Sequence, residues 1–153
     1  MAQYCTFYLE DRIFGLDILL IQEIIRLQEI TPVPNAPAFV AGLANLRGQI
    51  VVAVDLRLLF GLPPRGDRES INIILRSEGD AISLVADKAG DVVDFGEEPI
   101  IPPPGLRKES RADLILGVLK LKDTLLHVID TEAIFKNHSQ NQKALEAKST
   151  SLA

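Results

Sequence analysis

The amino-acid sequence predicts an all-β protein made of two similar small barrels or sheets that pack together. Short segments typical of strands follow one another at close spacing, with only brief helical segments between them. In addition, residues 42–60 (GLANLRGQIVVAVDLRLLF) recur without a gap 75 positions later as residues 117–135 (GVLKLKDTLLHVIDTEAIF). One continuous β-sandwich is the alternative architecture.

The repeat is carried by glycines, aliphatic side chains and an aspartate at matching positions. The aligned pairs are Gly42/Gly117, Leu43/Val118, Leu46/Leu121, Arg47/Lys122, Ile50/Leu125, Val54/Ile129, Asp55/Asp130 and Phe60/Phe135. A weaker match aligns residues 14–25 with residues 82–93 at an offset of 68. Because the offset grows by seven residues, we assign the extra residues of the second copy to a loop over residues 97–113.

Alternating apolar and polar residues predict the strands of the first copy. We expect strands over residues 3–9, 13–16, 22–27, 41–47 and 49–54. The unbroken apolar run 50–54 indicates burial on both faces. Asp17 and Asp55 each precede a short apolar segment, so both are predicted to cap brief helices. Three prolines within residues 32–37 enforce an extended, stiff crossing between the segments 22–27 and 41–47.

The second copy repeats this plan. We expect strands over residues 71–76, 80–86, 91–96, 112–121 and 124–129, and then a helix capped by Asp130. The polar stretch 63–70 (PPRGDRES) is interpreted as the connection between the lobes. The predicted organisation is one domain over residues 1–136, with lobes at about 10–65 and 70–136 and a contribution from the N-terminal strand. Residues 137–153 are poor in apolar side chains and are predicted to form a mobile tail.

Composition excludes several classes of protein. The 21 acidic residues outnumber the 16 basic ones, and the cations are scattered, so we expect no nucleic-acid partner. No apolar run approaches the roughly 20 residues of a membrane span, and the N-terminus does not resemble a signal peptide. We therefore expect a soluble cytoplasmic protein without membrane insertion. The single cysteine, Cys5, excludes an internal disulfide.

The sequence contains no pattern typical of a catalytic or metal site. His127 lies within a predicted strand and His138 within the predicted tail, and neither has ligand or triad partners at a recognisable spacing. No cofactor-binding glycine motif occurs either. Asp55 and Asp130 could be read as paired catalytic carboxylates, but their matching positions before short helices favour two structural caps, each worth about 1 kcal/mol. We therefore expect no enzyme activity, metal or cofactor.

The two copies differ most at the turn between their last two strands. The first copy has Asn45-Leu46-Arg47-Gly48 where the second has Lys120-Leu121-Lys122-Asp123. Structural demands should act on both copies, so this difference marks a position where the first copy has an additional role. Arg47 can donate to a carboxylate or a carbonyl at the strand end. Two interpretations stay open: an internal ion pair to Glu23 or Glu29 that fixes strand register, or a binding surface.

Five segments together form a specific set of motifs: Phe14-Gly15-Leu16-Asp17-Ile18, residues 21–26 (IQEIIR), residues 34–42 (PNAPAFVAG), Asn45-Leu46-Arg47-Gly48 and Val54-Asp55-Leu56-Arg57. In these segments the sequence resembles the CheW-like family of bacterial chemosensory coupling proteins. The resemblance extends from about Gln3 to Phe135. The resemblance implies two five-stranded, SH3-like β-barrel lobes and a non-enzymatic adaptor that links methyl-accepting chemoreceptors to the histidine kinase CheA. The implied partners are the cytoplasmic tip of the receptor hairpin and the regulatory domain of the kinase, in arrays at the inner face of the membrane.

Carried over by position, the resemblance assigns a receptor-binding surface or groove to six residues of the first copy. These are Ile21, Glu23, Gly42, Asn45, Arg47 and Gly48. It assigns no kinase-binding residues, because the second copy lacks a specific family signature. The alternatives are the same adaptor in a pilus-motility or other non-flagellar pathway, a small-molecule-binding or hydrolytic barrel with the loop 99–104 over a pocket, and a regulatory module of a longer kinase.

Overall fold

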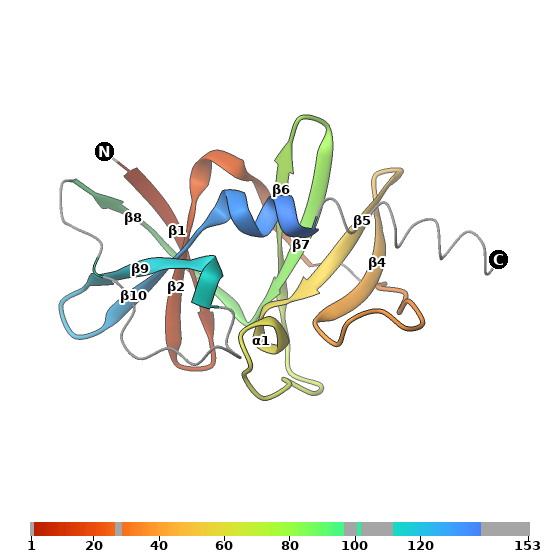
Figure 1. Cartoon of the computed structure of the whole chain (residues 1–153), viewed down its shortest axis with the longest axis horizontal. Helices are drawn as coiled ribbons and strands as arrows, with labels where there is room; N and C mark the ends of the chain where they lie inside the picture. The colour runs from red at the N-terminus through yellow and green to blue at the C-terminus, as the bar shows by residue number, and fades with distance from the viewer. Residues whose placement is uncertain (1, 27–28, 97–100, 102–111, 139–153) are drawn as a thin grey trace.

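The computed structural model contains two five-stranded sheets, which confirms the all-β prediction. It describes residues 2–26, 29–96, 101 and 112–138. Sheet A has the strand order β8 (Lys88–Phe95), β1 (Ala2–Leu9), β2 (Arg12–Asp17), β10 (Leu125–Ile129), β9 (Ile115–Lys120). Sheet B has the order β3 (Ile21–Ile25), β6 (Ile71–Ser77), β7 (Asp80–Ala86), β5 (Gln49–Asp55), β4 (Val40–Leu46). Figure 1 shows sheet A on the left and sheet B on the right.

The two sheets reproduce the sequence repeat strand by strand. In sheet A, Phe14 of β2 lies opposite His127 of the parallel strand β10. In sheet B, Ile82 of β7 lies opposite Val52 of the parallel strand β5. Phe14 and Ile82 are the pair aligned at offset 68, and Val52 and His127 are aligned at offset 75. Both offsets therefore match one common architecture.

Each copy of the repeat divides its strands between the two sheets. The first copy places β1 and β2 in sheet A but β3, β4 and β5 in sheet B, and the second copy does the reverse with β6–β7 and β8–β10. Sheet A thus draws on residues 2–17 and 88–129, and sheet B on residues 21–86. This differs from the expected lobes at 10–65 and 70–136. The reason is that the chain crosses between sheets directly after β2 and again after β7, so neither sheet corresponds to one copy.

Short helices follow three strands, each after an aspartate. Asp17 Oδ1 accepts a hydrogen bond from Leu19 N at 3.0 Å at the start of the 3₁₀ helix η1 (Ile18–Leu20). Asp55 Oδ1 accepts from Arg57 N at 3.0 Å at the start of α1 (Leu56–Leu59). Asp130 Oδ1 accepts from Ala133 N at 3.1 Å at the start of the helix over residues 131–138. These bonds satisfy backbone donors that a helix N-terminus otherwise leaves unpaired. A further 3₁₀ helix, η3 (Ala112–Leu114), precedes β9.

The largest hydrophobic core lies between the sheets and takes side chains from both. It includes Phe7, Leu9, Phe14 and Leu16 from sheet A and Ile73, Leu75, Ile82 and Leu84 from sheet B. Leu56 of α1, the C-cap Phe60, and Ile134 and Phe135 of the C-terminal helix complete it. The rings of Phe7 and Phe60 each stack on Phe14, with centroids 5.6 Å apart. Each sheet also encloses a smaller cluster of its own, around Val51 in sheet B and around Leu126 in sheet A. Because most of the core is shared, the two sheets stabilise each other.

The C-terminal helix begins at Thr131 and includes Asn137 and His138, which the sequence assigned to a tail. The side chain of His138 is buried, and its ring centroid lies 5.5 Å from that of Phe39, in the segment before β4. The helix runs from β10 towards sheet B (Figure 1). Its side chains Ile134 and Phe135 pack in the shared core. Residues 139–153 lie outside the described residues.

The predicted loop over residues 97–113 lies mostly outside the described residues. Within it, Ile101 exchanges backbone hydrogen bonds of 2.9 and 2.7 Å with Val118 of β9. Across the part of the chain that the structure describes, no helix is both long and apolar enough to span a membrane.

Candidate functional site

Arg47 and Glu23 form a bidentate ion pair on the surface of sheet B. Arg47 Nη1 donates to Glu23 Oε1 at 2.5 Å, and Arg47 Nη2 donates to Glu23 Oε2 at 2.9 Å. The side chain of Arg47 is 64% exposed and that of Glu23 is 23% exposed. The hydrogen bond from Arg47 lowers the pKa of Glu23, and the same contact raises the pKa of Arg47. Of the two partners that the sequence left open, Arg47 binds Glu23.

This ion pair joins the two edges of sheet B. Glu23 lies on β3 and Arg47 lies in the turn after β4, and these strands stand at opposite ends of the strand order. No strand pairing joins β3 to β4 among the described residues. A contact between opposite edges requires the sheet to curl towards closure. The pair therefore braces the curled sheet, and most of the arginine stays open to solvent.

The turn that carries Arg47 is a tight two-residue hairpin connection. Leu46 pairs with Gln49, and the two central residues, Arg47 and Gly48, have φ of 49° and 88°. Positive φ at both central positions is typical of a type I′ turn, which matches the twist of the flanking strands. Asn45 Oδ1 accepts from Gly48 N at 2.8 Å and closes the turn. Asn45, Arg47 and Gly48 are all exposed.

The remaining two residues assigned to this surface lie away from the turn. Gly42 is buried where the register between β4 and β5 shifts. A Cβ atom there would lie 2.2 Å from Thr31 O, because Thr31 bridges to Leu43. Ile21 is half-buried at the start of β3 and packs against the shared core. The structure thus brings Glu23, Asn45, Arg47 and Gly48 together, while Gly42 has a role in close backbone packing.

A buried ion cluster between the sheets was missed by sequence reasoning. Arg57 Nε donates to Asp87 Oδ1 at 2.8 Å, and Arg57 Nη2 also donates to Asp87. Arg65 binds both aspartates of the cluster, donating to Asp55 Oδ2 at 3.0 Å and to Asp87 Oδ1 at 3.1 Å. Glu10 N donates to Asp87 Oδ2 at 2.7 Å. The cluster links the turn after β1, the end of β7 and the segments around α1, so its role is structural.

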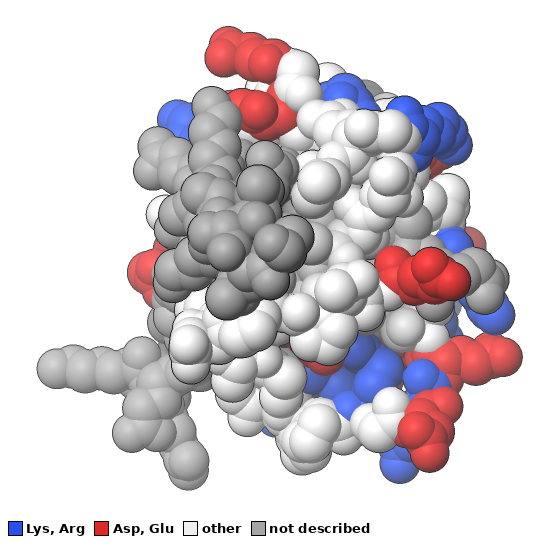
Figure 2. Space-filling model, turned by 90° about the vertical axis from the view of Figure 1, so that its right-hand side faces the viewer, with Lys and Arg blue, Asp and Glu red and all other residues white. Residues whose placement is uncertain are grey.

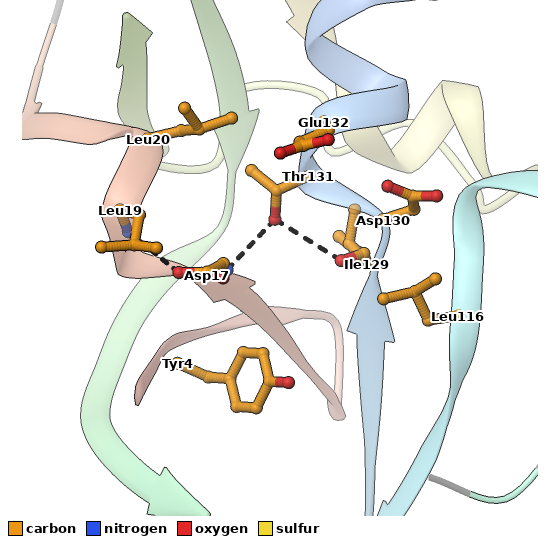
Figure 3. Close-up of a pocket in the computed structure, with 9 residues that line it drawn as sticks. All are labelled: Tyr4, Asp17, Leu19, Leu20, Leu116, Ile129, Asp130, Thr131 and Glu132. Carbon is orange, nitrogen blue, oxygen red and sulfur yellow. Dashed lines mark hydrogen bonds between the residues drawn. The ribbon is translucent and has the colours of Figure 1, made fainter. Parts of the chain in front are cut away.

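A cleft of about 370 Å³ opens between η1 and the start of the C-terminal helix (Figure 3). It is lined by Tyr4, Asp17, Leu19, Leu20, Leu116, Ile129, Asp130, Thr131 and Glu132. Thr131 Oγ1 ties its two walls together, since it accepts from Asp17 N at 3.1 Å and donates to Ile129 O at 3.4 Å. Burial, and then the nearby charge of Asp17, raise the pKa of Tyr4.

This cleft presents an apolar surface with acidic side chains at its edge. Leu19 is 85% exposed, and the carboxylates of Asp17 and Asp130 each already accept a backbone cap bond. Within the described residues, no three His, Cys, Asp or Glu side chains are grouped so that they could hold a metal ion. The described lining includes no residue of the loop 99–104, which the small-molecule alternative placed over a pocket.

Comparison with known proteins identifies the family to which this architecture belongs. The family model of the CheW-like domain matches residues 3–139. The chain belongs to the CheW-like family. It is 30% identical over 140 residues to the chemotaxis protein CheW of Treponema pallidum, covering 88% of this chain and 82% of the relative. It is 29% identical over 136 residues to the chemotaxis protein CheW of Klebsiella aerogenes, with the same coverage of 88% and 82%.

A solved CheW structure has the same fold. The scaffolding protein TtCheW from Thermoanaerobacter tengcongensis superposes with a TM-score of 0.74 at 31% identity, covering 84% of this chain and 83% of TtCheW. The resemblance read from the sequence is therefore confirmed. On the face of this CheW-like chain shown in Figure 2, uncharged residues occupy the middle, and acidic and basic side chains are intermingled at the top and right.

Proposed function

We propose that this CheW-like chain is a non-enzymatic adaptor that couples methyl-accepting chemoreceptors to the histidine kinase CheA in bacterial chemosensory arrays. In this role it works in the cytoplasm and is recruited to receptor arrays at the inner face of the membrane. The family membership supports a scaffold, and the Arg47–Glu23 pair is the observation that carries the receptor-binding part of the proposal.

The surface around this pair has the features that a helical partner needs. Arg47 is mostly exposed although both of its terminal nitrogens are already oriented by Glu23, so it offers a fixed cation to an incoming carboxylate or carbonyl. Ile50, 45% exposed, lies opposite Asn45 in the same hairpin and provides apolar contact beside the turn. An amphipathic helix binds such a surface through apolar anchors at helical spacing, and the charged rim selects its register.

The two-sheet architecture also suits an array component. Its two related sheets give the molecule two different ends, so one end can bind a receptor hairpin and the other the regulatory domain of the kinase. Each contact can be weak, because neighbouring contacts in an array raise the effective concentration of every binding site.

Separate binding assays test the proposal. The purified chain is mixed with a receptor cytoplasmic hairpin fragment in one experiment and with the CheA regulatory domain in another, and complex formation is measured by co-sedimentation and calorimetry. We expect saturable binding to both. The Treponema pallidum relative serves as the positive control. If that relative binds both partners and this chain fails to bind one of them under the same conditions, the adaptor role is contradicted.

A further inference from the structure

The edge strand β3 contains an irregularity next to Glu23. Ile21 lies opposite Leu75 of β6 and Glu23 lies opposite Ile74, so two neighbouring residues of β6 face three residues of β3. Gln22 is therefore the extra residue of a β-bulge. Bulges bend a strand and change the direction of nearby side chains, and they occur often at sheet edges and beside functional sites.

The side chain of Arg76, on β6, holds this bulge. Arg76 Nε donates to Gln22 Oε1, and Arg76 Nη1 donates to Gln49 Oε1 at 2.8 Å. Gln49 Nε2 in turn donates to Gly79 O at 2.9 Å, in the turn between β6 and β7. The half-buried side chain of Arg76 thus connects the bulged edge strand β3 to Gln49, the first residue of β5.

Arg76 also acts on Glu23 through its charge. The nearby guanidinium contributes to the lowered pKa of Glu23, after the larger contribution of Arg47. The bulge residue and the carboxylate that orients Arg47 are therefore under the influence of the same side chain.

The equivalent positions of sheet A lack this arrangement. At the repeat offsets, Arg76 corresponds to Tyr8, Gln22 to Gly90 and Gln49 to Thr124. Gly90 has no side chain to bind, and the ring of Tyr8 lies under Lys88 Nζ, 4.9 Å from its centroid. The bulge itself recurs where β8 pairs with β1. The clamp formed by Arg76 with Gln22 and Gln49, unlike the bulge, therefore belongs to the sheet that carries the Arg47–Glu23 pair.

We propose that Arg76 is a positioning residue for receptor binding: it holds β3 in its bulged conformation and so fixes Glu23, which orients Arg47 towards the partner. This proposal rests on the proposed function. Arg76 acts through Gln22 and Gln49, so removal of the glutamine side chains should reproduce its effect.

The test compares Arg76→Ala with Arg26→Ala. Arg26 lies just beyond β3 and makes one exposed contact of 3.5 Å with Glu69, so its loss changes the net charge equally without touching the clamp. Arg76→Ala should weaken binding of a receptor hairpin fragment about tenfold, as expected if a misaligned Arg47 loses one charge-assisted hydrogen bond to the partner. Arg26→Ala should leave the affinity unchanged. Arg76→Ala should also speed amide exchange of β3 and raise the pKa of Glu23 measured by NMR. Arg76→Lys should restore neither the receptor affinity nor the slow exchange of β3, because one ammonium cannot bind both glutamines with the geometry of the guanidinium. It keeps the positive charge and should largely preserve the lowered pKa of Glu23.

A double-mutant cycle with Gln22→Ala separates positioning from direct contact. If Arg76 positions β3 through Gln22, the two substitutions are non-additive in receptor affinity. If Arg76→Ala weakens binding while Gln22→Ala leaves affinity and β3 exchange unchanged, Arg76 contacts the receptor itself and the positioning role is wrong. Unchanged β3 exchange in Arg76→Ala would also overturn it. The exchange and pKa measurements need no partner, so they test the clamp even if the native chain fails to bind a receptor.

Discussion

Arg57 and Asp87 form a buried two-pronged ion pair at the crossing between the sheets, with Arg57 Nε 2.8 Å from Asp87 Oδ1. The side chain of Arg57 is 4% exposed and that of Asp87 is 15% exposed. Asp87 directly follows β7, at the point where the chain leaves sheet B for sheet A. Glu10 N, after β1, donates to the same carboxylate. This pair therefore holds the point where the chain crosses from sheet B to sheet A.

Removal of the carboxylate charge should destabilise the fold strongly. Asp87→Asn leaves Arg57 buried beside a neutral partner, and loss of one member of a buried pair costs about 3–5 kcal/mol. Urea unfolding at neutral pH measures the change. Asp94→Asn, which alters an exposed hydrogen bond to Gln3, should change stability by less than about 0.5 kcal/mol. Equal stabilities of the two variants would show that the buried pair contributes little.

The same carboxylate makes stability depend on acid. Hydrogen bonds from Arg57, Glu10 N and Arg65 outweigh the effect of burial and lower the pKa of Asp87 from 3.8 to about 2. A group with a lowered folded pKa stabilises the fold fully above its unfolded pKa, and this stabilisation is lost as the pH falls from about 3.8 to 2. The difference in unfolding free energy between native and Asp87→Asn should therefore shrink over that interval. A difference that stays constant down to pH 2 would contradict this assignment.

Gly42 and Gly48 should respond differently to the same substitution. Gly42→Ala places Cβ 2.2 Å from Thr31 O and should cost at least about 3 kcal/mol, since the backbone must move. Gly48→Ala meets no atom within 4 Å and costs only the strain of a positive φ, about 1 kcal/mol. Thermal unfolding ranks the two variants. The reverse order would mean that the bridge between Thr31 and Leu43 can relax freely.

A charge exchange separates the bracing role of Arg47 from its binding role. Arg47→Glu and Glu23→Arg should each lower the unfolding temperature, because each places like charges side by side across the edges of sheet B. The double variant restores an ion pair and should regain the unfolding temperature. It should not regain receptor affinity, since the partner then meets a carboxylate instead of a guanidinium. Full recovery of affinity would show that the pair only braces the sheet.

The sequence predicted the repeat and its strands because both depend on local patterns. The offsets of 68 and 75 align residues that occupy matching positions in the two parallel pairings. The positions of the strands and the three aspartate caps follow from the alternation and spacing of residues, which are patterns within short stretches of sequence.

The placement of β1–β2 and β6–β7 in the sheet opposite to the rest of their own copy could not be predicted in the same way. It depends on pairing of β2 with β10, where Phe14 meets His127 across most of the chain. No local pattern specifies such a partner. The Arg57–Asp87 pair and the contact of His138 with Phe39 were missed for the same reason, since each joins residues that are distant in sequence. Glu23 was one of two partners open to Arg47, and only the curl of sheet B selects it.

The most direct measurement of the central claim compares Arg47→Glu with Lys122→Glu in binding to a receptor hairpin fragment. The two positions are equivalent in the repeat, so the substitutions are chemically matched. The account predicts that Arg47→Glu lowers affinity at least about tenfold with its cooperative thermal transition retained, and that Lys122→Glu binds like the native chain. Equal affinities for the two variants, or loss of the thermal transition in Arg47→Glu, would contradict it.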